Sequence, residues 1–289
     1  MSSPSAKRRP RRWFLRRLGW AGAGLAVGFA YSRWIESRWL DIGSHEVLLW
    51  QGSPAPPVRL LHLSDFHASE VVPLSFIQRA VQTGLRLEPD LICITGDFIT
   101  SKFEEPSRYA AVLAPLARRA PTFACLGNHD GGSWAGSTYG YADTTVVRDI
   151  LKQAGITLLH NTARSQTVGG HRLNLVGVGD LWAGELDADA AFAGFPSTPD
   201  VPTVLLSHNP DSKTQVVRHT WDLLLCGHAH GGQFYLPLVG TPFAPVRDKR
   251  FVGGLHRWQE RWLHITKGVG NLHGLRFNCR PEISLLTLT

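Results

Sequence analysis

Cysteine is scarce in this chain, with four in 289 residues, and no two cysteines are separated by just two residues. A structural zinc site of the thiolate type needs closely spaced pairs, and a small disulfide-stapled domain needs a dense cysteine framework. Neither applies here. Three of the four cysteines, Cys93, Cys125 and Cys226, lie in apolar runs. We expect them to pack as small hydrophobic side chains.

The body of the chain lacks an excess of charge of either sign. Residues 1–38 carry nine Lys or Arg and one Glu, which leaves 21 basic and 22 acidic residues in 39–289. Binding to a nucleic-acid backbone needs a surplus of positive charge, so no nucleic-acid partner is expected. The hydrophobic fraction of 43% and the charged fraction of 18% are typical of a folded globular protein.

A long hydrophobic run is also lacking. The apolar stretch Leu18–Tyr31 has 14 residues, whereas a membrane-spanning helix needs about 20. It follows Arg11-Arg12-Trp13-Phe14-Leu15-Arg16, which is similar to the twin-arginine export pattern. We expect residues 1–43 to be a twin-arginine-type signal or an N-terminal membrane anchor with its linker. The domain 44–289 would then reach the periplasm or the outer face of the inner membrane. The alternative is an interfacial helix that leaves the body on the cytoplasmic face of the membrane.

Apolar runs bounded by turn residues alternate with helical patterns along the body. Strands are expected at 45–50, from 58, and at 91–95, 122–126, 203–207, 223–226, 262–266 and 282–288, with a hairpin at 166–178. Helices are expected from a cap at Ser75 to Leu85, over 108–118 and over 144–153. This order predicts a layered α/β fold.

Five of the apolar runs end in side chains of the types that bind metals. These side chains are Asp65 and His67; Asp97; Asn128, His129 and Asp130; His208; and His228 and His230. In chain order the motifs are D-x-H, G-D, G-N-H-D, S-H and G-H-x-H. Each position alone is more often a helix cap, a turn residue or a packed histidine. Five such motifs, each after an apolar run, favour one shared metal site.

The order of these motifs resembles that of the calcineurin-like metallophosphoesterase superfamily. Gly231-Gly232-Gln233 and Cys279-Arg280-Pro281 are similar to a bacterial subgroup that includes YaeI-type phosphodiesterases and UDP-2,3-diacylglucosamine hydrolases. The resemblance covers about residues 44–289. It implies a four-layer α/β sandwich in which two mixed β-sheets are flanked by helices. One departure is Phe98–Ser101, where many members carry Asp or Asn after the G-D pair.

The resemblance also implies roles for the motif residues. One metal would bind Asp65, His67 and His230, a second would bind Asn128, His208 and His228, and Asp97 would bridge the two. Ligands of this mixed kind suit two divalent ions, manganese first, with iron and zinc as alternatives. Such a pair activates water for in-line attack on phosphorus. His129 would protonate the leaving group or steady the phosphoryl oxygens, and Asp130 would orient His129. His62 faces away from this side of its strand and is expected to be structural.

Residues beyond the metal ligands are candidates for substrate contact. Trp134 and Tyr139 follow the G-N-H-D motif and could stack on a nucleobase, lie against acyl chains or only pack internally. His273, or Asn271, lies in a late glycine-rich loop. The apolar segments 234–239 and 242–245 follow His230 and would form an apolar rim.

Together with the N-terminal tail, this rim favours a phosphodiester or pyrophosphate that is lipid-linked, such as UDP-2,3-diacylglucosamine. The alternative is a phosphomonoesterase or nucleotide phosphohydrolase on the same metals. A non-catalytic, metal-dependent scaffold is disfavoured, because all seven ligand positions and His129 are present.

Overall fold

The computed structural model describes residues 11–50, 55–195 and 201–289, and its body contains two six-stranded sheets. In spatial order the first sheet consists of β1 (Asp41–Val47), β12 (Glu282–Leu288), β2 (Val58–Leu63), β3 (Leu91–Thr95), β4 (Thr122–Cys125) and β5 (Thr157–Leu158). The second consists of β10 (Gly254–Trp258), β11 (Arg261–Ile265), β9 (Leu223–Cys226), β8 (Thr203–Leu206), β7 (His171–Gly177) and β6 (Thr162–Val168). Each sheet contains both parallel and antiparallel pairs.

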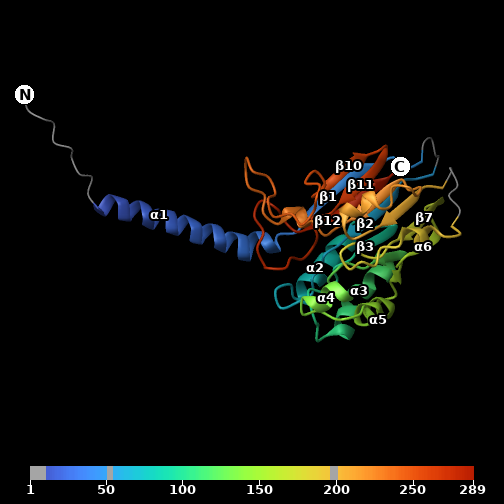
Figure 1. Ribbon diagram of the computed structural model, residues 1–289, viewed down its shortest axis with the longest axis horizontal. Helices are drawn as coiled ribbons and strands as arrows, with labels where there is room; N and C mark the ends of the chain where they lie inside the picture. The colour runs from blue at the N-terminus through green and yellow to red at the C-terminus, as the bar shows by residue number, and fades with distance from the viewer. Residues whose placement is uncertain (1–10, 51–54, 196–200) are drawn as a thin grey trace, which may run out of the picture.

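Helices cover the outer faces of the two sheets. The first sheet is covered by α2 (Leu74–Leu85), α3 (Pro106–Arg119) and α5 (Thr145–Ala154), with the short α4 (Ser133–Ser137) beside them (Figure 1). The small helix α6 (Ala188–Phe192) packs with the second sheet. The predicted fold of two mixed sheets flanked by helices is therefore confirmed.

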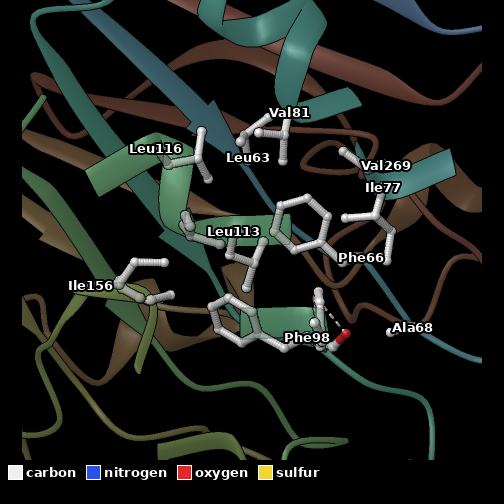
Figure 2. Packing of buried hydrophobic residues seen from close by; sticks show 14 of the residues in the cluster. Leu63, Phe66, Ala68, Ile77, Val81, Phe98, Leu113, Leu116, Ile156 and Val269 are labelled. Carbon is white, nitrogen blue, oxygen red and sulfur yellow. Dashed lines mark hydrogen bonds between the residues drawn. The ribbon is translucent and has the colours of Figure 1, made fainter. Parts of the chain in front are cut away.

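Successive side chains of each central strand point to opposite faces of the sheet and pack into two different hydrophobic cores. In β2, Leu61 and Leu63 face helices α2 and α3, whereas Leu60 packs between the sheets. Figure 2 shows the helix-side core, where Leu63, Val81 and Leu116 lie close together. Burying a leucine contributes roughly 1.5–3 kcal/mol, so these two cores hold the strand ends in fixed positions.

Most predicted elements lie within a few residues of the observed ones, and β1 differs the most. Its expected range was 45–50, but it begins at Asp41 because it pairs in parallel with β12 from Asp41–Glu282 to Val47–Leu288. The domain boundary expected between residues 43 and 44 thus falls inside β1, and the division of the chain stays a prediction. Ser75 does not cap α2, because Pro73 takes the N-cap position.

The N-terminal helix α1 (Arg11–Ala30) extends away from the body (Figure 1). A π-turn (Tyr31–Ile35) and a 3-10 turn (Glu36–Arg38) connect it to β1. These turns are tied to the body, because the buried Glu36 accepts a hydrogen bond from the Cys279 amide at 2.6 Å. The side chains of the twin-arginine-like residues 11–16 lie outside the described part of the structure. In the described residues, no helix is both long and apolar enough to cross a membrane.

Candidate metal centre

The motif residues gather where strands of both sheets end. Asp65 follows β2, Asp97 follows β3, and His228 follows β9. Five of the seven predicted ligands have left-handed backbone: Asp65 (φ 52°), His67 (48°), Asp97 (53°), His228 (62°) and His230 (49°). Such conformations cost roughly 1 kcal/mol or more for residues other than glycine and cluster at functional sites. The tight turns direct these side chains to one place.

The first group of ligand atoms comes from Asp65, His67, Asp97 and His230, all within 4.8 Å of one another. The Nε2 atoms of His67 and His230 are 3.1 Å apart. His230 Nε2 is 3.2 Å from Asp65 Oδ1, and His67 Nε2 is 3.4 Å from Asp97 Oδ2. Two carboxylates and two imidazoles therefore converge on one point.

The second group consists of Asp97, His208 and His228. His208 Nε2 is 3.1 Å from Asp97 Oδ2 and 3.2 Å from His228 Nδ1. Asn128 lines the same cavity as Asp97 and His228, and its buried Oδ1 has no hydrogen-bond partner among the described residues. Asp97 belongs to both groups, so the site is dinuclear in form.

The chemistry of these donors fits two divalent cations. Burial lowers the pKa of His67 and that of His228 to about 3, so both rings are neutral at ordinary pH and offer a nitrogen lone pair. Mixed carboxylate and imidazole donors suit first-row metals such as manganese, iron or zinc. The orphaned Asn128 Oδ1 would gain a partner in a bound ion.

Backbone groups hold the ligands in orientation. His208 Nδ1 donates to the Thr95 carbonyl at 2.7 Å, which leaves Nε2 for a metal. The carboxylate of Asp65 accepts the His228 amide at 3.1 Å. Gly268, at φ +73°, packs so close to Asp65 that an added Cβ would lie 2.7 Å from the Asp65 Cβ. Only glycine fits there.

Asp130 does not orient His129, which corrects the sequence interpretation. Its carboxylate accepts the backbone N–H groups of Gly127, Asp97 and Phe98 at 2.8, 2.9 and 2.7 Å. It therefore ties the G-D turn to the G-N-H-D turn. His129 is instead held through Nδ1 by the Thr100 carbonyl at 2.7 Å.

A cavity of about 490 Å³ opens over the ligands. Two of the three predicted substrate contacts, Trp134 and His273, line it. Tyr139 does not line it, because its side chain is 91% exposed in the turn after α4. Asn271 lies outside this cavity too; its Oδ1 accepts the Gly274 amide.

Two important residues were missed by sequence reasoning. Trp182 lines the cavity, and its ring centroid lies 4.3 Å from that of His228. It lies in the loop after β7, two residues beyond Asp180, and tryptophan is not a metal-binding residue type, so the search for ligand motifs did not single it out. Arg276 is fully buried and donates to the carbonyls of Lys267, Gly268 and Gly270 at 2.8, 3.0 and 2.6 Å. It fixes the loop that carries His273.

His62 is structural, as expected from strand alternation. Its ring is buried, with Nδ1 2.8 Å from His264 Nδ1 and Nε2 2.9 Å from the Thr95 hydroxyl.

Comparison with known proteins identifies the class of this protein. The calcineurin-like phosphoesterase family matches residues 58–232, so the chain belongs to that family and is an enzyme acting on phosphoester bonds. The predicted resemblance is confirmed.

The chain is 43% identical to phosphodiesterase YaeI of Escherichia coli (strain K12) over 279 residues, 96% of this chain and 98% of that protein. It is 28% identical to the UDP-2,3-diacylglucosamine pyrophosphatase LpxG of Chlamydia trachomatis over 277 residues, 79% of this chain and 83% of that one. Among solved structures, phosphopantetheinyl hydrolase PptH from Mycobacterium tuberculosis gives a TM-score of 0.42 at 13% identity, covering 77% of this chain and 92% of that chain.

Proposed function

We propose that this protein is a two-metal phosphodiesterase, with manganese as the preferred ion, that cleaves a lipid-linked phosphodiester or pyrophosphate such as UDP-2,3-diacylglucosamine. The observation that carries the proposal is Asp97, shared by two ligand groups at the floor of a cavity with an apolar rim. Two ions held there would neutralise phosphoryl oxygens and lower the pKa of a water towards about 7. Asp65, His67 and His230 would hold one ion, Asn128, His208 and His228 would hold the other, and Asp97 would serve both.

His129 is the proposed proton donor to the leaving oxygen. Its ring lines the cavity, and its Nδ1 is engaged by the Thr100 carbonyl. This hydrogen bond fixes the tautomer and leaves Nε2 to hold and transfer the proton. Trp134 packs edge-on against His129 with ring centroids 4.6 Å apart and restricts how the imidazole can turn.

A lipid-linked substrate is supported by the loop that borders the cavity. Phe234 and Phe243 line the cavity, and Leu238 and Val239, at the tip of the same loop, are exposed. The tip is a closed turn, because Leu236 and Gly240 exchange two backbone hydrogen bonds of 2.8 Å. Exposed apolar side chains beside a polar metal centre suit a substrate with a charged head and acyl chains. The relative LpxG is named a UDP-2,3-diacylglucosamine pyrophosphatase, which supports a lipid-linked substrate, and the relative YaeI is named a phosphodiesterase.

The proposal is tested with purified full-length protein and manganese. We expect turnover of detergent-solubilised UDP-2,3-diacylglucosamine, or of another lipid-linked diester, with a higher kcat/KM than for UDP-N-acetylglucosamine. Asp97→Ala is the matched inactive control. If soluble nucleotides or monoesters turn over and lipids are ignored, the protein is instead the nucleotide phosphohydrolase or phosphomonoesterase of the alternative reading.

We also propose that residues 1–43 associate with the membrane and direct twin-arginine export, which leaves the domain on the outer face of the inner membrane. The support is the sequence pattern at 11–16 and the exposed Trp20, Leu25, Val27 and Phe29 of α1. Fractionation of cells that carry the paired change Arg11→Lys and Arg12→Lys tests export. We expect the protein with both changes to be retained in the cytoplasm. If its distribution among the cell fractions equals that of the original protein, the cytoplasmic-face alternative is favoured.

A further inference from the structure

A second cavity, of about 250 Å³, lies at the base of α1. It is enclosed by the turns of residues 31–38, the start of α2 and the loop 271–274. Three arginines line it: Arg33, Arg38 and Arg79. Within the described residues, its lining contains no Asp or Glu and shares no residue with the cavity over the metal ligands.

These arginines concentrate positive charge that the protein itself does not neutralise. In the described parts of the chain, none of the three guanidinium groups forms an ion pair with a carboxylate. Arg79 donates instead to the carbonyl of Arg38 at 2.8 Å, which draws these two residues together. The acidic neighbour Glu36 is buried and accepts the Cys279 amide. Three like charges around one cavity favour an anionic ligand.

The start of α2 adds hydrogen-bond donors to the same cavity. Pro73 at the N-cap position gives no side-chain hydrogen bond to the helix, and the first turn contains no acidic residue. The amides of Phe76 and Ile77 donate to the Pro73 carbonyl. The donors that this end of the helix offers are therefore the amides of Leu74 and Ser75, which precede the first intrahelical hydrogen bond and carry partial positive charge. Ser75, in this first turn, also lines the cavity. Guanidinium forks beside an open helix N-terminus match the geometry of phosphate oxygens.

We propose that this three-arginine cavity binds a phosphate group, at a site separate from the metal centre. Water in bulk occupies roughly 30 Å³ per molecule, so 250 Å³ holds a phosphate together with part of the group attached to it. The phosphate belongs either to a lipid headgroup or to a soluble phosphate compound. The position at the base of α1 places a bound headgroup beside the helix that we propose to associate with the membrane. The site goes beyond the proposed function, because it does not depend on which ester is cleaved.

The test uses the full-length Asp97→Ala protein, so that binding at the metal centre does not contribute. Its affinity is measured by calorimetry for inorganic phosphate, and by flotation for vesicles of phosphatidylethanolamine with phosphatidylglycerol. The same measurements are then made on the Asp97→Ala protein that also carries Arg33→Gln and Arg79→Gln. Arg86→Gln, which alters an exposed arginine near the far end of α2, is the matched control. Thermal melting establishes that each variant is folded.

We expect the double arginine change to weaken binding of at least one ligand about tenfold or more, while Arg86→Gln leaves it unchanged; tenfold corresponds to about 1.4 kcal/mol. Weaker vesicle binding alone would identify a lipid headgroup, and weaker binding of inorganic phosphate would identify a soluble ligand. If neither affinity falls below that of Arg86→Gln, the proposal is wrong. Because hydrolysis is not measured, this result would leave the proposed function standing.

Discussion

Two carboxylates in successive motifs are distinguished by what they contact. Asp97 Oδ2 lies 3.4 Å from His67 Nε2 and 3.1 Å from His208 Nε2, one imidazole from each ligand group. Among the described residues, Asp130 accepts hydrogen bonds from backbone N–H groups alone. A side chain between two imidazole sets can hold ions, whereas one surrounded by amides stabilises turns.

Substituting the two aspartates should therefore have different effects. Asp97→Ala is expected to remove bound metal and to lower turnover at least about a thousandfold, because the bridging oxygen is lost. Asp130→Asn should retain metal but lower the free energy of unfolding by about 1–3 kcal/mol, because an amide nitrogen replaces one acceptor of buried N–H groups. Mass spectrometry measures the metal content of both variants, and chemical denaturation measures their free energy of unfolding. Normal metal content in Asp97→Ala would contradict the assignment.

The proposed role of His129 predicts that activity depends on the leaving group. His129→Gln should lower kcat about 10²- to 10⁴-fold for a diester with an alkoxide leaving group. The loss should be much smaller for bis-p-nitrophenyl phosphate, because p-nitrophenolate leaves without a proton. Equal losses on both substrates would show that His129 acts on the phosphoryl oxygens instead.

The buried pair His62 and His264 predicts a pH dependence of stability. Burial, together with the neighbouring imidazole, holds the pKa of His62 well below its usual 6.5. The unfolded chain thus binds more protons below pH 6.5, and the free energy of unfolding should fall as pH drops below that value. In His62→Gln the slope below pH 6.5 should shrink by about 1.4 kcal/mol per pH unit. The exposed His273→Gln is the control. An unchanged slope in His62→Gln would count against a neutral His62.

At the scale of elements, the loop from Phe234 to Phe243 is expected to distinguish lipid from soluble substrates. Leu238→Ser with Val239→Ser should raise KM for a lipid-linked ester about tenfold relative to KM for bis-p-nitrophenyl phosphate, because apolar contact with acyl chains is lost. Leu48→Ser changes an exposed leucine outside this loop and serves as the control. Parallel changes in both KM values would mean that the loop only shapes the cavity.

The central strands could be predicted because each is an apolar run closed by turn residues. Leu91–Thr95, Leu223–Cys226 and Glu282–Leu288 have the predicted bounds. The extent of β1 could not be read locally, since its partner β12 lies at the other end of the chain. Strand β10 was not predicted, because Gly254–Trp258 is only half-buried and lacks an apolar run.

The candidate site could be predicted for a related reason. Ligand motifs at strand ends are visible in sequence, and the structure brings them together. The partners of Asp130 and His129 were not visible, because backbone groups such as the Thr100 carbonyl carry no sequence signal. Trp182 was missed because its approach to His228 depends on the path of a loop.

Across the whole molecule, the proposed metal ligands connect the two sheets. Asp65 and Asp97 follow strands of the first sheet, and His208 and His228 follow strands of the second. Bound ions should therefore stabilise the complete fold. At a free metal concentration of a hundred times Kd, the free energy of unfolding should rise by about 2.7 kcal/mol for each independent ion. Calorimetric melting with and without manganese checks this, and Asp97→Ala should show a much smaller shift. Equal shifts in both proteins would place the stabilising metal elsewhere.

The most direct test of a two-metal phosphodiesterase is hydrolysis by the full-length protein after removal of metal. Bis-p-nitrophenyl phosphate and p-nitrophenyl phosphate are compared with manganese, zinc, magnesium or no ion, beside Asp97→Ala. We predict that manganese restores diester cleavage most strongly, that monoester cleavage is slower, and that Asp97→Ala is inactive under every condition. Diester cleavage that persists without metal, or in Asp97→Ala, would contradict the account.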